Sequence, residues 1–375
     1  MKQPFNLTVF LIFIASFAFG QDSSKIYLFV GSYTSGESSE GIAVYKLNTQ
    51  TGELTEVERA SNLVNPSFLT IAPNRQFLYA CTNTRLKKHG SISAFKIDTL
   101  TGKLTFLNQQ STGGRNPVHV IVNKTNRYVI ASNYTDAGIS IFECNADGSL
   151  QSFSKLIEFE GSSIIKGRQN AAHIHSCNFS FDNKYIFAPD LGSDKIRVLK
   201  FDKGLLTVID SLTIKTKSGA GPRHFTFHPN QSYAYSIEEL SGTISFYSYK
   251  NGQLKLSQTY RSYENESDEY ASSDIHISPD GKYLYASNRQ DENSISIFKI
   301  NPKNGELSLI GHQSTYGAIP RSFVISPTGK HLIVANQKTN EIVVFDRNAT
   351  SGLLTKVTVT VGLDAPASLK MVKYH

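Results

Sequence analysis

The chain has 375 residues, which is enough for two or three average domains or for one large all-β unit. Its formal net charge is +7, and its Lys and Arg residues are scattered along the sequence rather than gathered in one stripe. This distribution argues against a nucleic-acid partner and suits a small anionic ligand.

Residues 1–20 have the organisation of a secretory signal peptide. A positively charged start precedes a largely apolar run over residues 5–19, and small residues stand ahead of a cleavage site before Gln21. The apolar run is shorter than the ~20 residues that a membrane-spanning helix needs. We therefore expect a chain that is exported to the periplasm or secreted, with no membrane attachment after cleavage and one domain over residues 21–375.

Six copies of one pattern follow, each with an apolar run, a turn, a second run that ends in polar residues, and a third run closed by a turn. The clearest copy spans residues 272–307. The equivalent turn positions lie 48 to 57 residues apart and are occupied by Pro73, Lys124, Phe181, Pro229, Pro279 and Pro327. Spacings of this size, with several short strands in each repeat, are typical of propeller blades.

Within the clearest copy, residues 275–277 alternate with the two-residue period of a strand, and residues 283–285 are strand-prone. The turn between them contains Gly281, which is free to adopt a positive φ. Further Xaa-Gly turns are predicted after the third runs, at Gly52, Gly102, Gly252, Gly305 and Gly352.

The two ends of the chain complement each other. Residues 26–54 contain the later strands of a blade without its opening strand, and residues 365–374 contain an opening strand with nothing after it. Pairing them makes a seventh blade, so we predict an all-β, seven-bladed β-propeller whose ring is closed by the C-terminal strand. An open solenoid with two ragged ends is the alternative.

No cofactor or metal site is expected. His173 and His175 have a two-residue spacing on one strand, but no third ligand is adjacent in the sequence. The three cysteines, Cys81, Cys144 and Cys177, are far apart within strand-like runs, and we expect buried free thiols.

In a propeller blade, the first strand begins and the second strand ends on the same face, around the central channel. The residues that open the first strands are Ser67, Val118, His175, Arg223, Ser273 and Arg321, followed by Phe68, His119, Ser176, His224, Asp274 and Ser322. The residues that close the second strands are Thr82-Asn83, Asn133-Tyr134, Asp190-Leu191, Glu238-Glu239, Asn288-Arg289 and Asn336-Gln337. These convergent polar groups predict a site at one mouth of the channel, although the recurring Asn residues favour a structural role for that column.

Arg223 and Glu239 are 16 residues apart and should face each other across a hairpin. One possibility is a structural salt bridge in which each residue neutralises the other. The alternative is that Arg223 binds a substrate carboxylate or oxyanion while Glu239 or His175 transfers the proton. Arg289 and Arg321 would complete an anion pocket. Because we expect Arg223 at the mouth rather than in the core, its replacement by alanine should abolish activity with little loss of stability.

Four further residues are candidates for substrate binding. His119 and His224 are expected at the rim of the channel, and His173 and Gln337 lie in or beside the same sets of positions.

Several motifs resemble those of the seven-bladed propeller lactonase family, which includes bacterial 6-phosphogluconolactonases and fungal carboxy-muconate cyclases. They are VGSYT, NPVHVIV, AHIHS, GPRHFTFHP, EEL, SNR and ANQ, and the likeness covers essentially the whole mature chain. The resemblance implies lactone hydrolysis, or the reverse-type cyclisation, without a metal. It also implies catalytic roles for His175, Arg223, Glu239 and Arg289.

Three functions remain in competition at this point. The first is a lactone hydrolase that opens a sugar-acid or similar anionic lactone by general-base attack of water. The second is a non-catalytic propeller that binds the same class of ligand. The third is a cycloisomerase that acts on an unsaturated carboxylate with the same arginines and without water.

Overall fold

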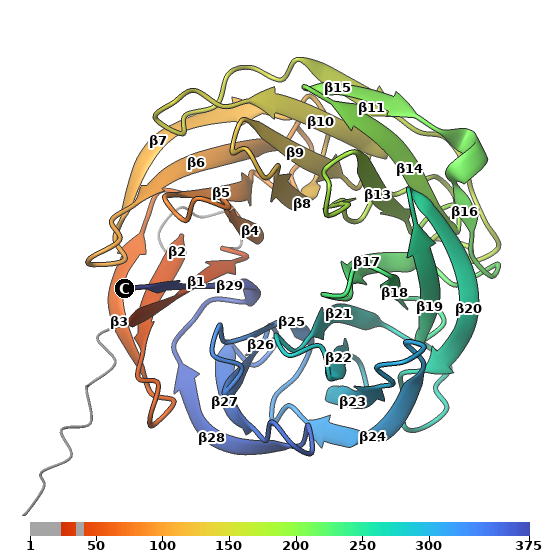
Figure 1. Ribbon diagram of the computed structural model, residues 1–375. Helices are drawn as coiled ribbons and strands as arrows, with labels where there is room; N and C mark the ends of the chain where they lie inside the picture. Colours follow the sequence, from red (N-terminus) through yellow and green to blue (C-terminus); the bar gives the residue numbers. More distant parts are fainter. Residues whose placement is uncertain (1–23, 35–40) are drawn as a thin grey trace, which may run out of the picture.

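The computed structural model describes residues 24–34 and 41–375. In this part of the chain, seven antiparallel sheets stand around one axis as the blades of a propeller (Figure 1). Its one helical segment is the 3-10 turn η1 (Asp210–Leu212), and it contains no helix long and apolar enough to span a membrane. The predicted all-β, seven-bladed fold is confirmed. The predicted signal peptide, residues 1–20, lies outside the described residues.

We number the blades in chain order. Blade 1 contains β1 (Lys25–Ser32), β2 (Ile42–Leu47), β3 (Leu54–Ala60) and β29 (Pro366–Tyr374). Blade 2 contains β4 (Phe68–Ile71), β5 (Phe77–Thr82), β6 (Ser91–Ile97) and β7 (Leu104–Ser111). Blade 3 contains β8 (Pro117–Val122), β9 (Tyr128–Asn133), β10 (Gly138–Glu143) and β11 (Lys155–Glu158). Blade 4 contains β12 (Asn178–Phe179), β13 (Tyr185–Asp190), β14 (Lys195–Asp202), β15 (Leu205–Val208) and β16 (Ile214–Lys215).

The remaining blades are regular four-stranded sheets. Blade 5 contains β17 (Pro222–Phe227), β18 (Tyr233–Glu238), β19 (Thr243–Lys250) and β20 (Gln253–Arg261). Blade 6 contains β21 (Ser272–Ile277), β22 (Tyr283–Asn288), β23 (Ser294–Ile300) and β24 (Leu307–Ser314). Blade 7 contains β25 (Pro320–Ile325), β26 (His331–Asn336), β27 (Glu341–Arg347) and β28 (Leu354–Val361).

The two ends of the chain close the ring as predicted. Strand β29, drawn in blue in Figure 1, pairs antiparallel with β1, so that Ile26 faces Lys373 and Val30 faces Leu369. Blade 1 therefore takes its innermost strand from the C-terminus and its other strands from the N-terminus. Without β29, the inner edge of β1 would be unpaired. The closure covers this edge and so protects the ring from edge-to-edge association.

The apolar core lies between neighbouring blades. One cluster joins Tyr235 and Ile244 of blade 5 to Leu284 and Phe298 of blade 6. The second strands are covered on both faces, as in β22, whose six residues are all buried, whereas the outermost strand β24 is largely exposed. A strand buried on both faces reads as a near-continuous apolar run, which is the pattern of the second run in each repeat.

Glycine turns lock each blade to its neighbour. Gly305 has a φ of +80°, and a Cβ atom at this position would lie 2.7 Å from the Tyr233 ring. Its carbonyl oxygen accepts a 2.6 Å hydrogen bond from the Tyr235 hydroxyl of the preceding blade. Only glycine combines this conformation with this close approach. Positive φ values also confirm the other predicted turn glycines, Gly52, Gly102, Gly252, Gly281 and Gly352.

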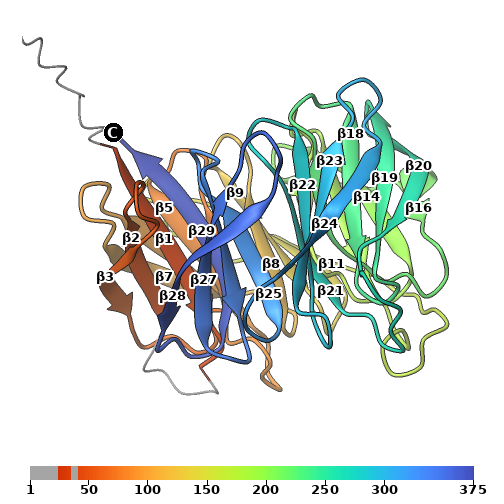
Figure 2. The ribbon, with the colours of Figure 1, turned by 90° about the horizontal axis from the view of Figure 1, so that it is seen from below.

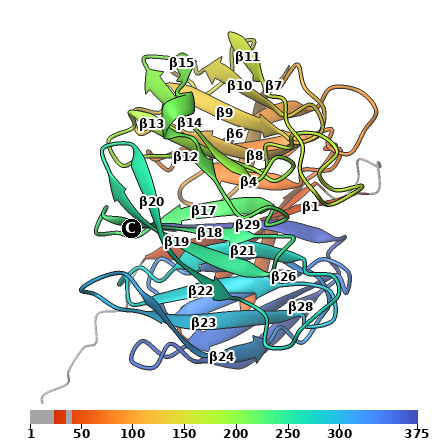
Figure 3. The same cartoon turned by 90° about the vertical axis from the view of Figure 1, so that its right-hand side faces the viewer.

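The first strands carry a recurring irregularity. The register of β17 with β18 shifts between Pro222 and His224, which makes Arg223 the extra residue of a β-bulge. The same shift occurs around Arg321 in β25. Bulges re-aim side chains next to binding sites. In the side views, the strands cross the thickness of the disc (Figures 2 and 3). The bulges lie at the beginning of β17 and β25.

The prediction of buried free thiols is confirmed for Cys81 and Cys177, whereas Cys144 is free but only partly buried. Burial raises the pKa of the Cys177 thiol to about 12. A thiol of this kind is protonated at neutral pH and chemically inert, so the cysteines are packing residues.

Candidate functional site

A cavity of about 270 Å³ opens at the end of the channel where the first strands begin and the second strands end. The charged, imidazole and phenol side chains on its wall are Tyr33, Arg85, Tyr134, Arg168, His175, Glu239, Arg289 and Arg321. All seven blades contribute to this wall, either through their strand ends or through the loops beside them. The fold therefore gathers at one point residues that are almost 300 positions apart in the chain.

The wall residues follow from the two-residue period of a strand. The last residue of each second strand is buried and bonded to a neighbouring segment, as Asn288 Nδ2 is to the Ser262 carbonyl at 2.9 Å. Asn336 Nδ2 bonds to the Thr315 carbonyl at the same distance, which agrees with a structural role for the Asn column. The next residue points the opposite way, and at this position Glu239 and Arg289 reach the cavity.

Three guanidinium groups surround the Glu239 carboxylate. Its Oε2 atom lies 2.8 Å from Arg223 Nε and 3.0 Å from Arg289 Nη2, and its Oε1 atom accepts a short hydrogen bond from Arg168. Burial acts to raise the pKa of the Glu239 carboxyl, but attraction to Arg289, Arg223 and Arg168 outweighs it and holds the pKa well below its ordinary value. Glu239 is therefore ionised at all working pH values and is a poor proton acceptor.

Arg223 lies behind Glu239 and does not form part of the cavity wall. Its Nη1 atom donates to the Ser273 carbonyl at 2.6 Å and to His224 Nε2 at 3.0 Å, and only 2% of the residue is exposed. The salt bridge with Glu239 predicted across the hairpin is present. The expectation that Arg223 lies at the mouth, outside the core, is wrong because the β-bulge turns its side chain into the body of the channel.

His175 is the one imidazole on the cavity wall within the described residues. Its Nδ1 atom is buried without a hydrogen-bond partner, and its ring lies 5.4 Å from the rings of Tyr134 and His224. Burial, followed by repulsion from Arg223, His224 and Arg321, holds the pKa of His175 well below its ordinary value. His175 is therefore neutral at neutral pH and has a lone pair available.

The other side of the cavity carries cations that no carboxylate neutralises. The guanidinium of Arg85 lies 3.7 Å from the centre of the Tyr33 ring, and Arg321 Nη2 donates to the Tyr33 hydroxyl at 3.1 Å. Burial acts to raise the pKa of Tyr33, but attraction to Arg321 and Arg85 outweighs it and lowers the pKa. This side of the cavity favours an anion.

Two of the predicted rim residues lie elsewhere. His119 and His224 line a second cavity of about 180 Å³, together with Asp274, His276 and Lys370. His224 Nε2 accepts the bond from Arg223, so its proton is on Nδ1, which donates to Asp274 Oδ1 at 2.8 Å. His224 thus anchors Arg223 rather than facing the first cavity.

His173 and Gln337 are also absent from the wall of the first cavity. The His173 ring stacks on Tyr134 with 4.3 Å between ring centres, and its Nδ1 atom bonds to the Tyr134 carbonyl at 2.9 Å. His173 thus positions a wall residue from behind. Gln337 is partly buried, and its backbone amide bonds to the Ile319 carbonyl. Of the nine residues predicted for the site, the wall contains His175, Glu239, Arg289 and Arg321.

Sequence reasoning missed Tyr33, Arg85 and Arg168. Tyr33 follows Ser32, which pairs with Pro366 as Glu238 pairs with Pro222, so Tyr33 is the blade 1 equivalent of Glu239. Extending the repeat alignment to the incomplete first copy would have found it. Arg85 and Arg168 lie in the loops after β5 and before β12, outside the repeat, and no periodic signal identifies them.

The wall therefore has two chemically distinct sides. Among the described residues, the wall contains four arginines and one carboxylate, that of Glu239, which leaves an excess of three positive charges. The arginines are Arg85, Arg168, Arg289 and Arg321. Neutral His175 supplies a proton acceptor beside guanidinium groups that suit a developing oxyanion. The arrangement can bind a small anion and promote addition of water to an adjacent carbonyl group.

Comparison with known proteins identifies the family. A family model described as "Lactonase, 7-bladed beta-propeller" matches residues 27–371. The 6-phosphogluconolactonases of Formosa agariphila and Bacillus subtilis are 45% and 35% identical to the chain, covering 92% and 93% of it and 99% of each relative. The solved structure of the periplasmic gluconolactonase of Pseudomonas aeruginosa has a TM-score of 0.88 at 30% identity, covering 93% of this chain and 99% of that one. The chain thus belongs to the seven-bladed β-propeller lactonase family.

Proposed function

We propose that this protein hydrolyses a small lactone that carries an anionic group, such as a sugar-acid lactone with a phosphate or carboxylate substituent. The observation that carries the proposal is the pairing of a neutral imidazole, His175, with unneutralised guanidinium groups in one cavity of about 270 Å³. The name 6-phosphogluconolactonase supports an anionic sugar-acid lactone, and the name gluconolactonase supports a sugar-acid lactone more generally.

In the proposed reaction, the substrate anion binds Arg321 and Arg85, and the lactone carbonyl oxygen approaches Arg289. The His175 imidazole accepts a proton from water as the water oxygen bonds to the carbonyl carbon. Arg289 stabilises the negative charge that develops on the carbonyl oxygen. The ring carbon–oxygen bond then breaks, and the proton passes from His175 to the leaving alkoxide, which yields the open hydroxy acid.

Glu239 and Arg223 have positioning roles in this proposal. Glu239 holds Arg289 and Arg168 on the wall, and Arg223 holds Glu239 from behind. This division selects His175 rather than Glu239 as the base, because a carboxylate bound by three guanidinium groups accepts a proton poorly. Glu239 is also the one carboxylate among the described wall residues, so the proposed reaction uses no metal.

We also propose that the protein is exported. The apolar run in residues 1–20 supports this proposal, as does the similarity to a gluconolactonase named as periplasmic. Sequencing the N-terminus of the protein recovered from its native host tests it. A mature chain that begins at Gln21 is expected, and a chain that retains residues 1–20 would contradict export.

The decisive experiment incubates the purified mature chain with a panel of phosphorylated, carboxylated and neutral lactones and with unsaturated carboxylic acids, and identifies each product. Ring opening with a clear preference for anionic lactones is expected. Saturable binding without turnover would instead indicate a binding protein. Ring closure of an unsaturated acid would indicate a cycloisomerase.

A further inference from the structure

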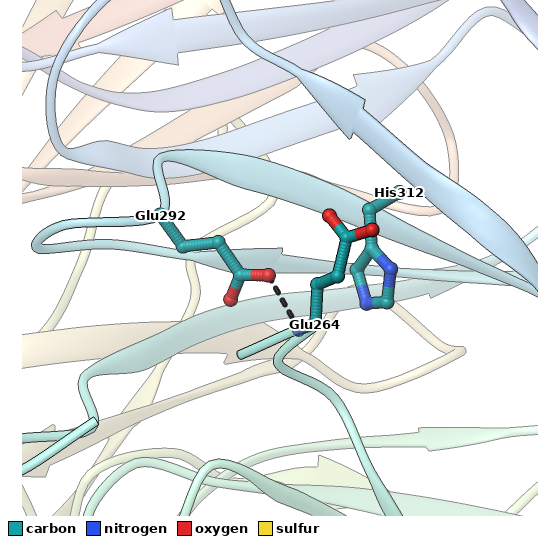
Figure 4. A group of neighbouring side chains, drawn as sticks. All are labelled: Glu264, Glu292 and His312. Carbon is teal, nitrogen blue, oxygen red and sulfur yellow. Dashed lines mark hydrogen bonds between the residues drawn. The ribbon is translucent and has the colours of Figure 1, made fainter. Parts of the chain in front are cut away.

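Three side chains of blade 6 and its incoming loop converge outside the walls of both cavities. Glu264 lies in the loop between β20 and β21, Glu292 lies in the turn between β22 and β23, and His312 lies on β24. One carboxylate oxygen from each Glu and one imidazole nitrogen lie within 4.8 Å of one another. Figure 4 shows the Glu264 side chain standing between Glu292 and His312.

The hydrogen bonds of these side chains leave oxygen and nitrogen lone pairs available to a metal ion. Glu292 Oε1 accepts a hydrogen bond from the Glu264 amide, but its Oε2 atom is buried and has no hydrogen-bond partner in the described part of the chain. His312 Nε2 bonds to the Ser262 carbonyl at 2.8 Å and therefore carries the proton. Nδ1 is then the nitrogen with a free lone pair, and the ring is held in place by a bond typical of metal-ligating histidines.

From this geometry we propose that Glu264, Glu292 and His312 form a binding site for a divalent transition-metal cation, with Zn²⁺ as the best match. Carboxylate oxygens and imidazole nitrogens are both zinc ligands, and the nitrogen donor favours zinc over calcium or magnesium. Glu264 is exposed, which leaves room for water as a further ligand.

The charge balance at the cluster supports a cation. Arg261 forms its ion pair with Glu266 at 3.9 Å, and no Lys or Arg in the described part of the chain forms an ion pair with Glu264 or Glu292.

The site would stiffen the cavity wall. The loop that carries Glu264 also carries Ala271, whose carbonyl accepts a 2.7 Å bond from Arg289 Nε, and Tyr263, whose hydroxyl donates to the Arg289 carbonyl at 3.1 Å. The turn that carries Glu292 also carries Arg289 and Gln290, which both line the cavity. A cation that joins the loop to the turn would therefore hold Arg289 in its position on Glu239.

The test is Zn²⁺ binding by isothermal titration calorimetry to the full mature chain after chelation and dialysis. One Zn²⁺ ion per chain is expected for the unmodified protein. Loss of an outer-shell partner alone lowers metal affinity about 10–100-fold, so Glu292→Gln and His312→Gln should each lower it by at least about tenfold. Hydrogen exchange of residues 262–271 should slow on addition of Zn²⁺ in the unmodified protein and not in either variant.

The matched control is the double variant Asp268→Asn, Glu269→Gln, which removes two exposed charges from the same loop and leaves the three ligands intact. It should bind Zn²⁺ like the unmodified protein. The proposal is wrong if the unmodified chain binds no Zn²⁺, if binding survives His312→Gln, or if the control loses binding as strongly as Glu292→Gln. Circular dichroism of each variant separates loss of the site from loss of the fold.

Discussion

Arg223 and Glu239 form a buried ion pair at 2.8 Å, with 2% and 7% of their side chains exposed. The hairpin of β17 and β18 brings the two residues together, and the β-bulge at Arg223 aims its side chain inward. Because Glu239 also binds Arg289 and Arg168, this pair connects the body of the channel to the cavity wall. The pair is thus a structural support of the site as well as part of its charge pattern.

Replacing Arg223 should destabilise the protein as well as inactivate it. Removing one partner of a buried ion pair typically costs about 3–5 kcal/mol, so Arg223→Ala should lower the free energy of unfolding by about that amount in urea titrations. The control is Arg127→Ala, which breaks an ion pair with Glu143 whose side chains are 64% and 39% exposed. That variant should change the free energy of unfolding by less than about 1 kcal/mol. Equal effects in the two variants would contradict a supporting role for Arg223.

His175→Asn should lower kcat by about 10²–10⁴-fold on the best lactone, since it removes the proposed general base. The melting temperature should change little, because Nδ1 has no hydrogen-bond partner to lose. His89→Asn, at an exposed position, serves as the control and should retain full activity. A fully active His175→Asn enzyme would rule out the proposed base.

Arg321→Gln should weaken the binding of anionic substrates selectively. A hydrogen bond to a charged group contributes about 1.5–3 kcal/mol, so KM for an anionic lactone should rise by roughly 10–100-fold. KM for a neutral lactone of the same ring size should stay nearly constant, and this comparison is the control. Equal losses on both substrates would show that Arg321 shapes the cavity without recognising the anion.

Stability should fall as the pH is lowered below about 6.5. Burial lowers the pKa values of His119 and His175 well below the ordinary value and that of His224 to about 4. These rings stay neutral in the folded protein and gain protons on unfolding, so their stabilising effect is present above the unfolded pKa and is lost as pH falls. Each contributes a slope of up to about 1.4 kcal/mol per pH unit.

The lowered pKa of Glu239 acts in the same direction at lower pH, since its ionised form is stabilised in the fold and that contribution is lost as the carboxyl becomes protonated. Urea titrations at a series of pH values measure the combined slope. His175→Asn should reduce the slope of the free energy of unfolding against pH over the range where unfolded histidine gains its proton. At alkaline pH, the free energies of unfolding of the variant and the unmodified protein should differ by a constant amount. A flat profile in the unmodified protein would contradict the buried neutral histidines.

Removal of residues 366–375 should prevent cooperative folding. This truncation deletes β29, which supplies the innermost strand of blade 1 and the apolar side chains of Leu369 and Val372. The unpaired face of β1 would then promote aggregation. Removal of the exposed His375 alone is the control and should leave thermal unfolding unchanged. A truncated chain that unfolds as sharply as the control would show that ring closure contributes little.

Most of the fold was predictable because a propeller repeats its local chemistry. The recurring turns, with Gly281 and Gly305 as examples, mark the strand ends, and the complementary end segments predict the closure of β29 on β1. Repeat alignment also predicts the wall positions of His175, Glu239, Arg289 and Arg321, since position within a blade sets which end of the channel a residue reaches.

The sequence by itself determined the closed seven-bladed ring and the end of each blade at which the polar residues gather. Only the tertiary structure decided which of them face the cavity. The β-bulge places Arg223 behind Glu239. His224, which is bonded to Arg223, donates to Asp274 instead of facing the cavity. Arg85 and Arg168 reach the wall from loops outside the repeat. The physical reason is that side-chain direction and ionisation depend on neighbours from other blades, which no periodic pattern along one chain encodes.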